Sequence, residues 1–108
     1  MHRREEVDVE VKVLMTWNIR IDKDREYFEF LIKQFLPGMQ RLGLQPTDAW
    51  FTAYGEGPQV LTAALVPSYE AARYILASQA WQHLEEKLRD YVTDYRYKIV
   101  PARDGFQL

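Results

Sequence analysis

The stretch from Pro58 to Val100 switches its hydrophobic period twice, and this switch constrains the fold more than any other feature of the chain. Residues 59–66 form a short apolar run that predicts a strand, and the apolar residues after them recur at helical spacing. Ser68 and Ser78 are each placed to cap a helical segment, which predicts a helix broken in the middle. Residues 95–100 alternate again, the pattern of a closing strand. This unit is half of a two-layer α+β fold.

A predicted strand and a predicted helix precede this unit. Apolar residues occupy the odd positions from Val7 to Trp17, the pattern of a strand with one buried face. Asp22 and Asp24 then provide caps and favourable charge for the start of a helix. The predicted buried stripe of that helix consists of Phe28, Leu31, Ile32, Phe35, Met39 and Leu42.

Two residues are expected to distort and to end this helix. Pro37 lacks an N–H donor and crowds the preceding turn, which predicts a kink or a break near Leu36. Gly43 can adopt the left-handed conformation that commonly ends a helix. A second strand is predicted over residues 47–54, and the two glycines after it favour an antiparallel hairpin with strand 59–66.

The predicted order is strand, helix, strand, strand, broken helix, strand. With right-handed crossovers, this order gives the ferredoxin-like βαββαβ fold, a four-stranded antiparallel sheet with both helices on one face. We expect residues 1–108 to form a single α+β domain, with tails at 1–6 and 102–108. The inward stripe of the second helix is predicted to contain Trp81, Leu84, Leu88 and Tyr91. Glu85 and Arg89 are spaced to pair on its solvent side.

The second face of this sheet is the basis for predicting a dimer. Two helices cover only one face, whereas Leu14, Trp50 and Tyr54 are predicted to project from the other. A buried aromatic ring removes roughly 150 to 250 Å² of surface from water. Several exposed rings would make a large apolar patch on a monomer. We therefore expect a second copy to pack sheet against sheet as a closed barrel, and the alternative is a face that stays partly exposed.

Several segments resemble the NIPSNAP-like branch of the dimeric α+β barrel proteins. They are 65–70 (LVPSYE), 77–81 (ASQAW), 97–100 (YKIV), the tail residue Phe106, and 35–39 (FLPGM) with the later Gly43. The resemblance covers nearly the whole chain and implies a ferredoxin-like homodimer. Its motifs are structural, and the family pattern defines no catalytic residue.

Composition excludes several classes of function. The chain has 14 Lys and Arg residues against 16 Asp and Glu residues, a net charge of −2, so a nucleic-acid partner is not expected. The absence of cysteine excludes disulfides and thiolate chemistry. No apolar run is long enough to span a bilayer, which favours a cytoplasmic protein without a membrane partner. His83 has no second histidine at helical spacing, so neither a metal site nor a cofactor is expected.

Two sets of candidate site residues remain. Asn18, Tyr54 and His83 are the catalytic candidates, because related barrel folds include cofactor-free and haem-degrading monooxygenases that use such side chains. The competing interpretations are a turn-forming role for Asn18 and a surface position for His83. The candidates for lining a ligand cavity have apolar bodies with polar groups, suited to an aromatic or lipid-like ligand, and plain dimer packing is their alternative. They are Thr16, Trp50, Thr52 and Tyr54.

Three functions are consistent with these observations. The first is a homodimer that binds a small apolar or aromatic molecule, or acts as an interaction module. The second is a cofactor-free monooxygenase or isomerase acting on a small hydrophobic substrate. The third is a structural dimer whose barrel is filled by side chains. The sequence does not identify a ligand.

Overall fold

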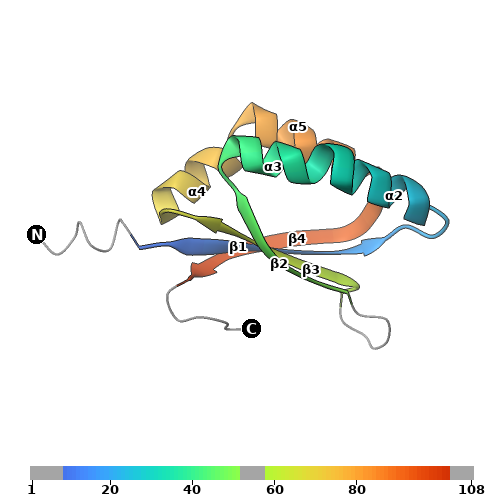
Figure 1. Cartoon of the computed structure of the whole chain (residues 1–108), viewed down its shortest axis with the longest axis horizontal. Coiled ribbons are helices and arrows are strands. Elements are labelled where there is room, and N and C mark those ends of the chain that lie inside the picture. The colour runs from blue at the N-terminus through green and yellow to red at the C-terminus, as the bar shows by residue number, and fades with distance from the viewer. Residues whose placement is uncertain (1–8, 52–57, 103–108) are drawn as a thin grey trace, which may run out of the picture.

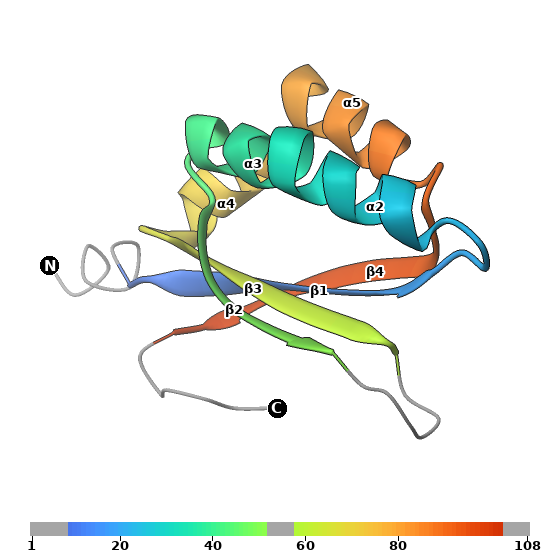
Figure 2. The same ribbon diagram turned by 45° about the vertical axis from the view of Figure 1, so that its right-hand side comes forward.

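The computed structural model describes residues 9–51 and 58–102 and confirms the predicted ferredoxin-like fold. The sheet has the strand order β2-β3-β1-β4, and all neighbouring strands are antiparallel. All the helices lie on one face of this sheet (Figures 1 and 2). The elements in chain order are β1 (Val11–Ile19), α2 (Asp24–Phe30), the π-helical η1 (Leu31–Phe35), α3 (Leu36–Leu42), β2 (Gln45–Phe51), β3 (Val60–Val66), α4 (Tyr69–Leu76), α5 (Gln79–Leu88) and β4 (Val92–Pro101).

The core lies between the sheet and the helices. The odd residues of β1 face it, as the alternation predicts, and Val13, Met15 and Trp17 are almost fully buried. Aromatic rings from both layers meet there: the ring centroids of Trp17 and Phe35 are 5.9 Å apart, and those of Phe35 and Trp81 are 5.8 Å apart. Of the described elements, none lies against the other face of the sheet, which we call the far face (Figure 2).

The prediction for the first helix is partly wrong. Phe28 and Ile32 are exposed, whereas Tyr27 and Phe30 are buried. The cause is the π-helical turn Leu31–Phe35, which places one more residue between hydrogen-bonded partners than an α-helical turn does. The extra residue rotates the preceding helix by about 100° relative to a regular continuation. The buried face therefore moves by one residue along α2.

The expected distortion near Pro37 takes the form of this π-helical turn and not of a break. Phe30 and Phe35, at the junctions, both keep right-handed helical angles, so the helix continues through the turn. Pro37 is the second residue of α3, and its missing N–H removes one hydrogen bond from the helix that continues through the turn. Gly43 ends the helix with a φ of 102°, which confirms the predicted left-handed C-terminus.

The predicted break in the second helix is confirmed. The Ser68 Oγ accepts a hydrogen bond from the Ala71 N–H at 3.0 Å and begins α4. The Ser78 Oγ accepts one from the Trp81 N–H at 3.2 Å and begins α5. These two caps divide the predicted second helix into α4 and α5.

Candidate ligand-binding site

A cleft of about 590 Å³ lies between α4 and β4, on the helix-facing side of the sheet. Leu76 and Ile99 are its more buried lining residues, and the exposed rings of Tyr69 and Tyr97 form its walls. This volume falls within the range of small-molecule sites, roughly 300 to 1,000 Å³. The lining consists of Tyr69, Arg73, Leu76, Ala77, Tyr97 and Ile99.

Two features of the sequence bring these side chains together. Tyr69 and Arg73 are one helical turn apart on α4, so they lie side by side, with the Arg73 guanidinium 5.8 Å from the centre of the Tyr69 ring. Tyr97 and Ile99 alternate on β4 and pair with Met15 and Val13, which face the core. Because β4 is an edge strand, the helices cover it incompletely, and the Tyr97 side chain keeps 47% of its exposure.

A buried polar pair lies next along β4. The Tyr95 hydroxyl donates a hydrogen bond of 2.6 Å to the Glu85 carboxylate of α5. Burial, followed by the hydrogen bond and the negative charge of Glu85, raises the pKa of Tyr95. The Arg89 guanidinium lies 5.0 Å from the centre of the Tyr95 ring, and the Tyr95 and Tyr97 rings are 6.4 Å apart. The neighbouring rings of Tyr95 and Tyr97 thus connect the Tyr95–Glu85 pair with the cleft.

The predicted solvent-side pair of Glu85 and Arg89 is therefore wrong. Glu85 is only 9% exposed and points toward the sheet. Four residues advance an α-helix by about 400°, so Glu85 lies only about 40° around α5 from the buried Trp81. Tyr95 supplies the hydrogen bond that makes a buried carboxylate tolerable.

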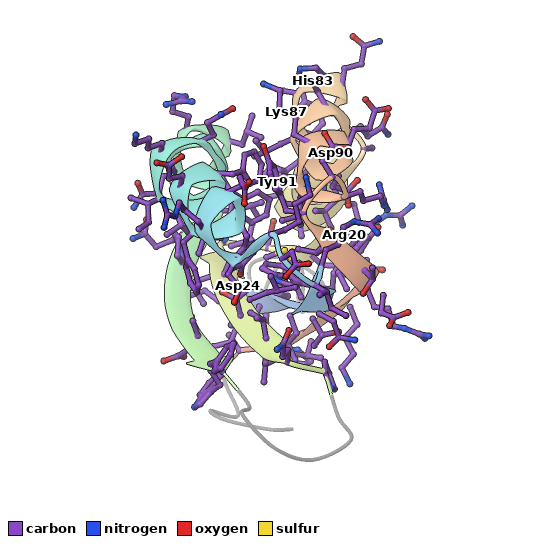
Figure 3. The ribbon with its side chains drawn as sticks, turned by 90° about the vertical axis from the view of Figure 1, so that its right-hand side faces the viewer. Arg20, Asp24, His83, Lys87, Asp90 and Tyr91 are labelled. Atoms are coloured by element: carbon purple, nitrogen blue, oxygen red, sulfur yellow. The ribbon has the colours of Figure 1, made fainter. Side chains whose placement is uncertain are left out.

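The two catalytic candidates among the described residues lie apart. The Asn18 side chain donates to the Asp94 carboxylate at 3.1 Å and accepts from the Gln59 N–H at 2.8 Å, so it ties β4 and the start of β3 to β1. His83 is exposed on the side of α5 that faces away from the sheet (Figure 3). Tyr54, the third candidate, lies outside the described residues.

Thr16 and Trp50, two of the predicted ligand-lining residues, lie on the far face and not in the cleft. Thr16 and Trp50 are both cross-strand partners of Leu61, one on each side of it. Thr52 and Tyr54 lie outside the described residues. Sequence analysis brought Thr16 and Trp50 to one face but missed the cleft, although two signals for it exist: the Tyr69 and Arg73 spacing, and the period of two along β4.

Two further surface depressions are lined mainly by polar and charged residues. One is lined by Asp22, Asp24, Arg25 and Glu26, and another by Gln79, Ala80, Gln82, His83 and Glu86. Within residues 9–51 and 58–102, no group of three or more His, Asp or Glu side chains is arranged to hold a metal ion. No helix among these residues combines the length and hydropathy needed to cross a bilayer.

Comparisons with known proteins place the fold. Profiles of known protein families and the curated proteins give no match. Among solved structures, a NIPSNAP-family protein from Agrobacterium tumefaciens str. C58 matches with a TM-score of 0.67 and 17% identity, over 91% of this chain and 90% of that chain. A dimeric protein of unknown function and ferredoxin-like fold from Bacteroides fragilis NCTC 9343 matches with a TM-score of 0.60 and 10% identity, over 85% and 95%.

A mutant of SnoaB, a cofactor-independent oxygenase from Streptomyces nogalater, matches with a TM-score of 0.62 and 16% identity, over 87% of this chain and 93% of that chain. The structural neighbours are thus NIPSNAP-family and dimeric ferredoxin-like proteins, the group that the sequence resembles. At these identities the likeness establishes the fold, and the function must be argued from the site.

Proposed function

We propose that this protein is a single-domain homodimer that binds a small aromatic or apolar molecule in the α4–β4 cleft. The observation that supports binding most strongly is the pair of exposed tyrosine rings, Tyr69 and Tyr97, beside the aliphatic side chains of Leu76 and Ile99. A ring inserted between them would bury apolar surface worth about 25 cal/mol per Å². Favourable ring-to-ring geometry adds about 0.5–1.5 kcal/mol per aromatic pair.

The far face supports the dimer. Its central residues are apolar: Leu61, Ala63 and Leu65 on β3, and Leu14 on β1, which pairs with Ala63. Lys98 on β4 pairs with Leu14, and the Lys12–Asp48 ion pair lies on the same face beside Leu65 and Ala63, so charged side chains border the apolar residues. An apolar centre with a polar rim is the usual anatomy of a protein interface.

Closing the far face would leave the proposed ligand site accessible. The cleft uses Tyr97 and Ile99, which point to the helix side of β4, whereas Lys98 between them points to the far face. A dimer formed through the two far faces would therefore carry one cleft per copy, on its outer layers. Binding and dimerisation can thus be tested separately.

The binding proposal is tested with 2-naphthamide, a neutral aromatic probe, by isothermal titration calorimetry. We expect saturable binding to the native chain, and about tenfold weaker binding to Tyr97→Ala, because losing one ring contact and its buried area costs about 1.4 kcal/mol or more. Tyr74→Ala is the matched control, since Tyr74 is on the same helix α4 as Tyr69, is 80% exposed and does not line the cleft. Absence of saturable binding, or an equal loss in both variants, would contradict the proposal.

A cofactor-free monooxygenase or isomerase is the second candidate, favoured by the buried Tyr95–Glu85 pair. A carboxylate within 2.6 Å of a tyrosine hydroxyl can accept a proton, either directly or through that hydroxyl. For the monooxygenase, with hydroquinone as substrate in air-saturated buffer, we expect oxygen uptake above the spontaneous rate, reduced about 100-fold or more in Glu85→Gln. An uptake rate equal to that of buffer alone, or unchanged in the variant, would exclude Glu85 as a base for this substrate.

A further inference from the structure

We infer that the α4–β4 cleft selects an aromatic ligand that carries a carboxylate, and that Arg73 is the residue that binds this group. The inference rests on the proposed function and specifies the chemical class of its ligand. It is based on two observations: the walls of the cleft are aromatic, and its described lining contains one cationic side chain. Arg73 is the only charged residue among the six described lining residues.

The Arg73 guanidinium is available to a ligand. Among the described residues, Lys12 and Asp48 on the far face form an ion pair within 4.0 Å. Arg73 forms no ion pair with any described residue. No described residue forms a side-chain hydrogen bond with the Arg73 guanidinium either. Glu70, three residues earlier on α4, lies outside the lining of the cleft and forms no such pair with Arg73. The guanidinium thus retains all its donors for an acceptor that enters the cleft.

The position of this cation favours a carboxylate on a flat ring. The guanidinium lies 5.8 Å from the centre of the Tyr69 ring, a cation–π distance that restricts where the side chain can point. A guanidinium is planar and can donate two parallel hydrogen bonds to one carboxylate. A ligand ring placed between Tyr69 and Tyr97 would bring a carboxylate at its edge toward this donor pair.

The alternative is that Arg73 is only a solvated surface charge, and this alternative predicts a different ligand selectivity. Exposed arginines on helices commonly serve only as solvated charges, and their removal changes little. If that holds here, the cleft would bind neutral and anionic aromatic molecules alike. The two interpretations therefore differ in selectivity between ligands and not in whether a ligand binds.

The test compares 2-naphthoate with its neutral isostere 2-naphthamide by isothermal titration calorimetry. We expect the native chain to bind the naphthoate more tightly. Arg73→Gln is expected to weaken naphthoate binding about 10- to 100-fold, the loss typical of a charge-assisted hydrogen-bonded pair, and to change naphthamide binding less than about twofold. Arg41→Gln, an exposed arginine on α3 outside the cleft, is the matched control and should leave both affinities unchanged.

Arg73→Lys adds a second readout, because lysine keeps the charge but loses the two-donor geometry. Naphthoate affinity for this variant should lie between those of the native chain and of Arg73→Gln, and it should fall more steeply with added salt than naphthamide affinity does. Equal affinity of the native chain for both probes, or an equal loss of both in Arg73→Gln, would overturn the inference alone. Failure of both probes to bind would overturn the proposed function, and the inference with it.

Discussion

Replacing Leu61 by arginine should convert the protein from a dimer into a monomer. Leu61 lies on the far face between its cross-strand partners Thr16 and Trp50. It is only half-buried, so the single chain can accommodate a longer side chain there. In a sheet-to-sheet dimer the guanidinium would be enclosed without a partner charge, which costs about 3–5 kcal/mol, or a loss of about 10²- to 10³-fold or more in the dimerisation constant.

Multi-angle light scattering after size-exclusion chromatography measures this change directly. The native chain should elute with twice the chain mass of 12.8 kDa, and Leu61→Arg with the mass of one chain. Ile32→Arg is the matched control, because Ile32 is a 64% exposed aliphatic residue in the helical layer. Circular dichroism should be alike for all three proteins. A native chain that is monomeric at every concentration would contradict the proposed dimer, whereas a Leu61→Arg variant that remains dimeric would contradict its formation through the far face.

The sequence predicts most of the fold because each segment shows a single hydrophobic period, either that of a strand or that of a helix. The alternation along Val11–Ile19 and the serine caps at Ser68 and Ser78 each depend on residues close in the chain, and all three are observed. The π-helical turn at Leu31–Phe35 could not be predicted this way. A regular helical stripe would bury Phe28 and Ile32, whereas a stripe interrupted by one extra residue buries Tyr27 and Phe30. All four side chains are aromatic or aliphatic, so the hydrophobic pattern does not distinguish the two.

The candidate site is harder to predict for a different reason. Each wall of the cleft comes from a separate element, α4 or β4, and the cleft exists because β4 is at the edge of the sheet. A hydrophobic pattern does not distinguish an aromatic residue that is covered by a helix from one that is left at its margin. Tyr95 and Tyr97 occupy the same face of β4, yet the first is partly buried against Glu85 and the second forms part of the cleft.

The two tyrosines with raised pKa values should make the fold sensitive to alkaline pH. Burial raises the pKa of Tyr27, partly offset by the hydrogen bond of 3.0 Å that its hydroxyl accepts from the Trp17 indole N–H. Burial and then Glu85 raise the pKa of Tyr95. In the unfolded chain both hydroxyls titrate near the ordinary value of about 10. Above that pH the unfolded state binds fewer protons than the folded state, so the free energy of unfolding falls as pH rises.

Tyr95 should lower the free energy of unfolding by up to about 1.4 kcal/mol per pH unit above about 10, and Tyr27 should act in the same direction, while full stability is retained below that pH. Urea unfolding between about pH 8 and pH 11 measures this slope. In Tyr95→Phe the slope should be smaller by about 1.4 kcal/mol per pH unit, whereas Tyr74→Phe, at an 80% exposed position, should behave like the native chain. Tyrosinate absorbance provides the independent check. If all seven tyrosines ionise near pH 10 while the chain is still folded, the burial of these two hydroxyls is not what links stability to pH.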